Sequence, residues 1–247
     1  RQMCIRDRFL AFYQKDTDAA TKFLRKSMKL NISKFQEATV KLLLADILVL
    51  QEKFNEALIF YSQIQANLKN STISQEARFK VAKTSYFKGD FDWAESQLKI
   101  LKSSTSQLIA NDALDLKLLI SDNKYEDSTR TALKLYAKAD LYTFQNKTDK
   151  AISILDKILT EHKGESIIDQ ALYQQAKLYE EKKFFDKAEA NYLIIIKDYS
   201  EDILMDDALY HLAELYNTYL AKPEDAKANY ERIIFEHEDS IYFIDAR

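Results

Sequence analysis

Few side chains in this sequence have the types and spacing that chemistry requires. The chain has three histidines: His162, His211 and His237. They are far apart, and none belongs to an HExxH motif or to a His/Cys group whose ligands could converge on a metal. Acidic neighbours at 180–181 and 206–207 are typical of helix starts and solvated faces. Walker, Rossmann and GxSxG motifs are also missing. We therefore expect no enzymatic activity, no cofactor and no metal site.

The composition indicates a helical protein. The 247 residues include only two glycines and one proline, whereas 30% are charged and 47% are hydrophobic. Strand hairpins and phosphate loops need glycine, so a chain this poor in glycine is mostly helix. The net charge of −3 and the lack of a Lys/Arg stripe argue against a nucleic-acid partner. Apolar stretches such as 42–50 are shorter than the roughly 18 residues that cross a bilayer, so no direct membrane insertion is expected.

Alanine recurs at a fixed period along the whole chain. The first set of marker alanines is Ala20, Ala57, Ala94, Ala151, Ala188 and Ala226. The steps between them are 37, 37, 57, 37 and 38 residues. A second set lies 20 residues after four of the first: Ala77, Ala171, Ala208 and Ala246. Two markers interleaved at one offset indicate a true repeat.

Each repeat has the pattern of a helical hairpin. In the segment DDALYHLAELY (206–216), apolar residues recur every three or four positions, which places them on one helix face. A short polar turn follows. The second helix then carries its marker alanine and a large apolar residue four positions later, as in Ala188 and Tyr192. Such hairpins cannot bury their apolar faces alone, so several must stack.

These features resemble the tetratricopeptide repeat family. The best copies are VAKTSYFKGDFDWAESQLKIL (81–101), QAKLYEEKKFFDKAEANYLII (175–195) and LAELYNTYLAKPEDAKANYERII (212–234). The resemblance runs from about residue 9 onward and implies an all-α, right-handed superhelical solenoid of antiparallel helix pairs. The period of 37 exceeds the family's usual length of about 34, and the usual closing proline is absent. The segment 197–216 is most similar to bacterial, envelope-associated members.

The predicted units are 9–33, 36–70, 73–104, 129–164, 167–200 and 203–238, followed by the start of another at 241–247. The 57-residue step indicates an irregular unit near 104–130, with a degenerate repeat at 105–128. Two interpretations remain. Either this unit kept its first helix (111–120) and lost its second, which we favour, or a full extra helix reverses the stacking direction.

The resemblance also implies where a partner would bind. In this family the first helices line a concave groove. The matching ring positions are Phe79, Tyr136, Tyr173 and Tyr210, and four residues further on are Lys83, Asp140, Lys177 and Glu214. Tyr86 completes the predicted groove. Rings beside alternating charges suit an extended or helical peptide. Alternatively, the same rings pack between neighbouring first helices as shared core.

The functional expectation is a non-catalytic scaffold that binds partner proteins or peptides, with a role in cell-envelope assembly. The alternative is a regulatory or sensor segment of a larger protein whose catalytic domain lies outside this sequence. The sequence does not indicate a cellular location or an oligomeric state. Because function in repeat proteins depends on surface side chains, the fold alone does not identify the partner.

The first eight residues, RQMCIRDR, do not follow the repeat pattern, which begins abruptly at Phe9. They resemble the translated end of a transposon adapter used in sequencing libraries, so we expect residues 1–8 not to be native. On that interpretation Cys4, the one cysteine of the chain, is not part of the protein. The alternative is a genuine amphipathic helix start with a free thiol.

Overall fold

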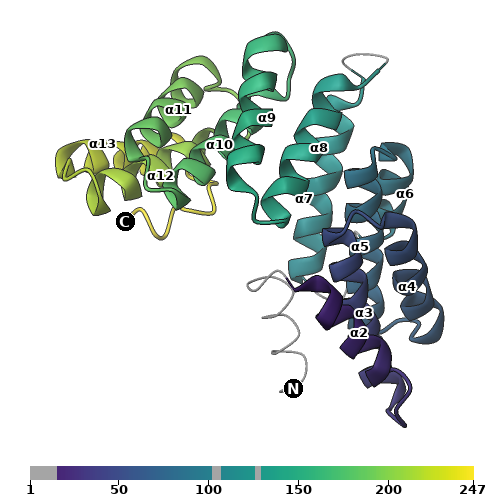
Figure 1. Cartoon of the computed structure of the whole chain (residues 1–247). Helices are drawn as coiled ribbons and strands as arrows, with labels where there is room; N and C mark the ends of the chain where they lie inside the picture. The colour runs from purple at the N-terminus through teal and green to yellow at the C-terminus, as the bar shows by residue number, and fades with distance from the viewer. Residues whose placement is uncertain (1–15, 102–106, 126–128) are drawn as a thin grey trace. The chain divides into compact units, whose positions relative to one another are not determined.

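A computed structural model describes residues 16–101, 107–125 and 129–247 (Figure 1). All regular secondary structure in these residues is α-helical. The first seven helices are α2 (Thr17–Ser27), α3 (Lys34–Leu50), α4 (Phe54–Asn67), α5 (Thr72–Lys88), α6 (Phe91–Leu101), α7 (Gln107–Asn123) and α8 (Thr131–Phe144). The others are α9 (Thr148–Glu161), α10 (Ile168–Glu181), α11 (Phe185–Asp198), α12 (Met205–Thr218) and α13 (Pro223–Glu236). The predicted adapter octet, Cys4 included, lies outside the described residues.

The chain divides into two compact units, Arg1–Lys147 and Thr148–Arg247. The division falls between α8 and α9, inside the segment 129–164 that the sequence treats as one hairpin. In each unit, most helices that follow one another in the chain pack as antiparallel neighbours, for example α3 on α4 and α12 on α13 (Figure 1). This is the all-helical hairpin architecture expected from the sequence. No described helix is long and apolar enough to cross a membrane.

The marker alanines lie at the helix crossings. All ten are buried, and most have no exposed surface. A methyl group lets two helices approach closely, and the larger residue four positions later fills the space beside the crossing. Tyr61, Leu98, Leu155 and Tyr192 have this role after Ala57, Ala94, Ala151 and Ala188, and each is at most 1% exposed. The period seen in the sequence is therefore the period of helix packing.

The hairpin turns also repeat. One residue of the turn after a first helix has a positive φ at five equivalent places: Glu52, Gly89, Asn146, Lys183 and Ala221. At four of these turns the next N–H donates back to the carbonyl five residues earlier, as from Phe184 to Tyr179 at 2.8 Å. This is the Schellman ending, which satisfies the last carbonyls of a helix and normally uses glycine. Here only Gly89 is glycine, so the geometry of the hairpin imposes a left-handed conformation on ordinary residues.

We expect Lys183→Gly to raise the free energy of unfolding by about 0.5–1 kcal/mol, because the left-handed region penalises a side chain but not glycine. The reverse change, Gly89→Ala, should lower it by about 1 kcal/mol. A Cβ on Gly89 would meet only Lys134 Cγ at 3.9 Å, so this loss is conformational rather than steric. Urea unfolding checks both values. Equal signs for the two changes would contradict this account of the turns.

The irregular unit consists of one long helix, α7, and a polar connection to α8. Residues 124–130 join the two, and the described part of this connection contains no helix. α7 packs mainly against α6, whereas α8 packs along α5.

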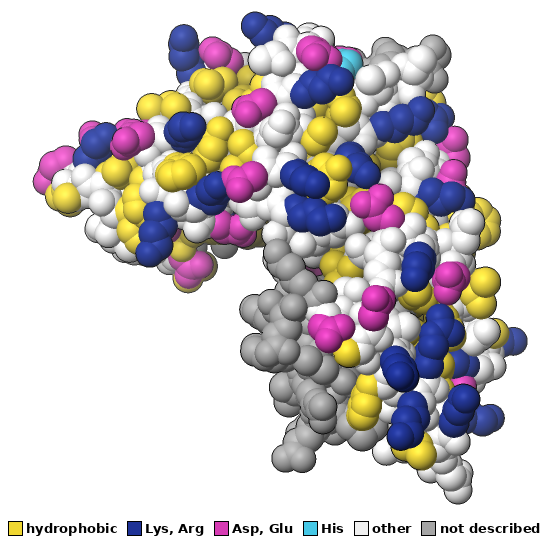
Figure 2. Space-filling view, viewed as in Figure 1, with side chains coloured by type: hydrophobic (Ala, Val, Ile, Leu, Met, Phe, Trp, Pro, Cys, Tyr) yellow, Lys and Arg dark blue, Asp and Glu magenta, His cyan; other side chains and the backbone are white. Residues whose placement is uncertain are grey.

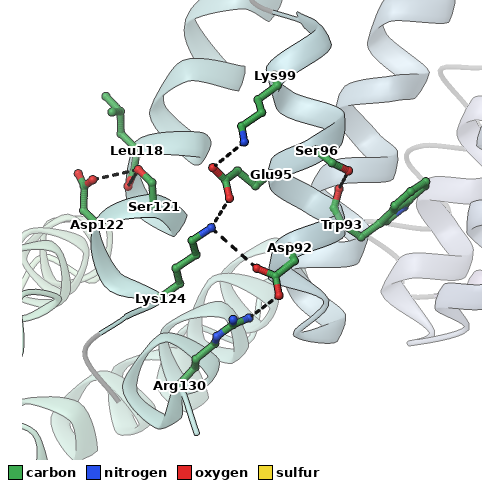
Figure 3. A network of polar contacts seen from close by, with 10 residues as sticks. All are labelled: Asp92, Trp93, Glu95, Ser96, Lys99, Leu118, Ser121, Asp122, Lys124 and Arg130. Atoms are coloured by element: carbon green, nitrogen blue, oxygen red, sulfur yellow. Dashed lines mark hydrogen bonds and ion pairs between the residues drawn. The ribbon is translucent and has the colours of Figure 1, made fainter. Parts of the chain in front are cut away.

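Ion pairs join Lys124 and Arg130 of this connection to acidic residues of α6 (Figure 3). The Lys124 ammonium lies against Glu95 and 3.8 Å from Asp92, and it is almost fully buried. Arg130 continues the network, with its Nη1 3.0 Å from Asp92 Oδ2. The hydrogen bond from Lys124 holds the pKa of Glu95 below its usual range. The network thus links Lys124 and Arg130, at the two ends of this connection, to α6.

Candidate functional site

In the first unit, the predicted groove residues lie on α5 and α8, which pack side by side. Phe79 and Lys83 are partly exposed, but Tyr136 is buried and Tyr86 has no exposed surface. Asp140 lies near Lys83 and Tyr86, and burial raises its pKa while the Lys83 charge opposes the rise. Tyr86 and Tyr136 therefore belong to the packing between the two helices, and the structure leaves Tyr86 no surface for a partner.

Tyr86 contributes only its ring. It packs against Phe87 and Phe91 at centroid distances of 5.7 and 5.9 Å, and its hydroxyl has no hydrogen-bond partner among the described residues. Tyr61, also buried, is different because its hydroxyl donates to Asp46 at 2.6 Å. The buried Tyr86 hydroxyl thus destabilises the folded state because it loses its hydrogen bonds to water, whereas the Tyr61 hydroxyl stabilises the folded state.

The expected effects of removing the two hydroxyls are opposite. Tyr86→Phe should leave the free energy of unfolding unchanged or raise it by up to about 1 kcal/mol. Tyr61→Phe should lower it by about 1–2 kcal/mol, because Asp46 loses a donor in a buried site. Urea unfolding of the two variants under one set of conditions makes the comparison. A clear loss for Tyr86→Phe would mean that its hydroxyl has a partner.

In the second unit, the predicted residues join a larger group of rings that we call the tyrosine cluster. Its members are Tyr173 on α10, Tyr192 on α11, Tyr210 and His211 on α12, Tyr230 on α13 and Tyr242 in the segment 237–247. Tyr210 stacks on Tyr242 at 4.2 Å, and the rings of Tyr173 and Tyr192 lie 5.9 and 6.3 Å from that of His211. The cluster joins both hairpins of this unit.

Carboxylates accept the cluster's hydroxyl groups. Tyr192 donates to Glu180, Tyr230 donates to Glu214, and Tyr242 donates to Asp207 at 2.8 Å. Burial, together with these bonds, raises the pKa of each of the three tyrosines well above its usual range. The hydroxyls therefore stay protonated near neutral pH and serve as hydrogen-bond donors, which is a structural arrangement rather than one poised for proton transfer.

Lys177 and His211 form the polar edge of the cluster. Lys177 Nζ lies 3.3 Å from His211 Nδ1 and 3.6 Å from Glu180 Oε2. Because an ammonium group can only donate, it requires a neutral His211 with Nδ1 as acceptor. Burial and the Lys177 charge lower the pKa of His211 to about 4. The histidine is therefore a neutral packing group.

Stability should fall between pH 6.5 and about 4 because of this histidine. In the unfolded chain His211 binds a proton near pH 6.5, whereas in the folded chain it does so only near pH 4. The neutral His211 therefore contributes fully to the free energy of unfolding above pH 6.5, and this contribution is lost as the pH falls toward 4. Asp169 acts in the opposite direction, because burial raises its pKa to about 6. What the protonated Asp169 contributes to the free energy of unfolding is therefore lost as the pH rises through about 6.

The variant His211→Gln isolates the histidine, since Asp169 is common to both proteins. Between pH 7.5 and 4.5, wild type should lose about 1–2 kcal/mol more free energy of unfolding than the variant. Urea unfolding at several pH values measures the difference. Parallel pH profiles would show that His211 titrates normally in the folded chain.

The accessible part of the site is its polar edge. The Lys177 side chain is 39% exposed, Glu214 is exposed, and Tyr173 and Tyr210 are partly exposed. The described residues contain no group of three side chains suited to a metal. The arrangement offers ring edges and opposite charges on two adjacent first helices, α10 and α12. Chemically it can bind a polypeptide segment.

Several members of this cluster are not evident from the sequence. There, His211, Asp207 and Glu180 resemble ordinary packing or surface residues, and Tyr192 is the large residue that follows a marker alanine. A signal existed at Tyr210–His211, where two ring side chains follow each other on one helix. Tyr242 could not be found in this way, because it lies in the segment predicted to begin another helix. There, residues 241–246 form turns, in which the Ala246 N–H donates to the Tyr242 carbonyl at 2.9 Å.

Comparison with known proteins bears on the second unit. Residues 207–240 match the family model described as a tetratricopeptide repeat, and they include α13 and most of α12. A comparison with curated proteins finds no match.

Two solved structures are similar to the chain. One, described as the functional characterization of Pseudomonas aeruginosa pilF, is 11% identical, with 95% of this chain and 90% of that one covered and a TM-score of 0.38. The other, Naa15/Naa10 bound to HypK-THB, is 17% identical, with 99% of this chain covered and a TM-score of 0.38. This chain spans only 38% of the latter. The family match confirms the resemblance over residues 207–240, so this all-helical chain of hairpins has at those residues the sequence pattern of a tetratricopeptide repeat.

Proposed function

We propose that this chain is a non-catalytic scaffold that binds a protein or peptide partner, and that the polar edge of the tyrosine cluster is a contact surface. One observation supports this above all: Lys177 and Glu214, at equivalent repeat positions of α10 and α12, present opposite charges beside partly exposed rings. Fixed charges set the register of a bound segment, and rigid rings supply contact area at low entropic cost. In the first unit, Phe79 and Lys83 are the corresponding accessible residues.

The role in cell-envelope assembly and the preference for a protein over a nucleic acid are part of this proposal. They are supported by the sequence resemblance and by the net charge of −3. Identifying the genes beside this one in its native genome tests the first. Titration with single-stranded RNA at low salt tests the second, and tight binding there would contradict it.

A random-peptide display library tests the binding surface. Peptides selected on the immobilised chain should bind the double variant Lys177→Glu/Glu214→Lys at least about tenfold more weakly, because both fixed charges are reversed. Lys197→Glu, on the exposed face of α11, is the matched control and should bind like wild type. Failure to enrich any peptide would contradict the proposal. Enriched peptides that tolerate the double variant would place the binding surface elsewhere.

A further inference from the structure

Two surfaces far apart in the sequence have opposite charge and exposed apolar side chains. The first, the basic patch, covers α2 and the start of α3. It consists of Lys22, Arg25, Lys26, Lys29, Leu30, Lys34 and Phe35, all exposed. No acidic residue occurs between Asp18 and Glu37. Figure 2 shows the resulting concentration of Lys and Arg side chains over this end of the first unit.

A pocket adjoins the basic patch. It lies between the start of α3 and the end of α4 and has a volume of about 140 Å³. Its walls include the stems of Lys34 and Lys41 and the apolar side chains of Ala38, Ile64 and Leu68. A cavity of about 150 Å³ can hold a benzene ring. The pocket therefore has the size of one phenyl side chain. Among the described residues, Lys34 supplies its unpaired cation, because Lys41 is paired with Glu37, another wall residue, at 2.6 Å.

The second surface, the acidic patch, covers the end of α13 and the segment after it. Its apolar members Phe235, Ile241 and Ile244 are 76%, 81% and 75% exposed. Its acidic members are Glu236, Glu238, Asp239 and Asp245, and no lysine or arginine occurs from 235 to 245. Arg232 pairs with Glu236 at 3.2 Å, which leaves the other three carboxylates to define the charge.

Packing of the segment explains why these side chains point outward. Tyr242 and Ala246 pack inward on Met205, Leu209 and Ile233. Ile241 and Ile244, which flank Tyr242 in the same turns, consequently face solvent. Together with the carboxylates beside them, these three exposed side chains offer apolar area to a partner.

We propose that the acidic patch of one copy of this chain docks on the basic patch of a second copy, with the Phe235 ring in the pocket beside Lys34. The apolar contacts supply affinity, and the facing carboxylates and ammonium groups supply register and salt sensitivity. Because each copy keeps one patch of each kind free, the contact is heterologous and extends into open chains or closed rings. This association is separate from the partner binding proposed above.

Sedimentation equilibrium of the full chain tests the association. The average mass should rise with concentration up to about 200 µM in 50 mM NaCl, as for a weak interface. In 500 mM NaCl the affinity should fall by at least about tenfold, because screening weakens exposed charge pairs. A monomer of constant mass at low salt would overturn the proposal.

Two variants give a sharper test. Lys29→Glu/Lys34→Glu disables the basic patch, and Phe235→Ser/Ile241→Ser disables the acidic patch. Each alone should be monomeric, whereas an equimolar mixture should form a dimer and nothing larger, because each variant keeps one working patch. Lys163→Glu/Lys197→Glu, two exposed sites outside both patches, is the control and should associate like wild type. Circular dichroism checks that all variants keep their helices.

The remaining outcomes are also decisive. Association that survives both patch variants, or a mixture that stays monomeric, would overturn the proposal. If wild type is monomeric but its acidic patch binds a synthetic lysine- and leucine-rich peptide, the surface serves a foreign basic partner and self-association is wrong. None of these results depends on Lys177 or Glu214, so failure here is distinguishable from failure of the proposed binding function.

Discussion

Replacing Tyr192 by alanine should lower the free energy of unfolding by about 3–5 kcal/mol. The side chain has no exposed surface, and its ring lies against Tyr173 and His211. Alanine would leave a cavity at the centre of the tyrosine cluster and would remove the donor to Glu180. Because helices on both sides are held by the rest of their contacts, the space cannot close fully, and the cavity adds to the lost burial energy.

The neighbouring residue provides the control. Leu193 follows Tyr192 on α11 but is 45% exposed, so Leu193→Ala should cost less than about 1 kcal/mol. Urea unfolding followed by circular dichroism compares the two, with separate fits if the two units unfold in separate transitions. Similar losses for both variants would mean that the cluster is not a packed core. The tyrosine cluster packs between α10 and α12, the helices that carry Lys177 and Glu214. We therefore expect Tyr192→Ala to weaken peptide binding and Leu193→Ala to leave it unchanged.

Replacing Lys80 by methionine should lower the free energy of unfolding by about 2–4 kcal/mol. Asp46 is 5% exposed and receives two contacts that bind three helices together. Lys80 Nζ on α5 lies 2.9 and 3.0 Å from its oxygens, and the Tyr61 hydroxyl on α4 donates at 2.6 Å. Methionine keeps the volume of the stem but leaves a buried carboxylate without its cation. Because the Lys80 side chain is partly exposed, the expected loss of free energy of unfolding is smaller than the largest losses measured when a fully buried ion pair is broken.

A triple variant separates the buried charge from the packing. Asp46→Leu/Tyr61→Phe/Lys80→Met removes all the polar members together and should lie within about 1 kcal/mol of wild type, because well-packed apolar groups can replace a buried pair. Lys88→Met is the matched surface control. Its ion pair with Asp90 is 3.0 Å long and about half exposed, so the change should cost less than about 0.5 kcal/mol. Equal losses for Lys80→Met and Lys88→Met would show that Asp46 is solvated.

The sequence predicted the parts of this protein that depend on local contacts. Helix formation, the hairpin period and the small residue at each crossing follow from side chains within about 40 residues of one another, and Ala57, Ala151 and Ala188 lie where the period requires. The left-handed turns repeat with the same steps, yet the sequence does not show them. Glu52 and Lys183 do not resemble Gly89, because the packing of the hairpin and not the residue sets their conformation.

The candidate site was predictable only in part. Tyr173 and Tyr210 do stand at equivalent places, but the structure surrounds them with His211 on α12 and with Tyr192 and Tyr242 from two other segments. Tyr136 stands at the equivalent place in the first unit but is buried on α8, which packs along α5. Whether a ring lines a groove or fills a core depends on which helix lies against it.

By itself, the sequence determined the helices, their pairing into hairpins and the tetratricopeptide repeat at 207–240, because these arise from periodic contacts between neighbours in the chain. Only the tertiary structure decided that Asp46 and Lys80 meet, that Lys124 fastens the irregular segment to α6, and that Ile241 and Ile244 face solvent while Tyr242 does not. Whether a side chain is buried or forms an ion pair depends on how several helices pack in three dimensions. The repeat period of the sequence does not specify that packing.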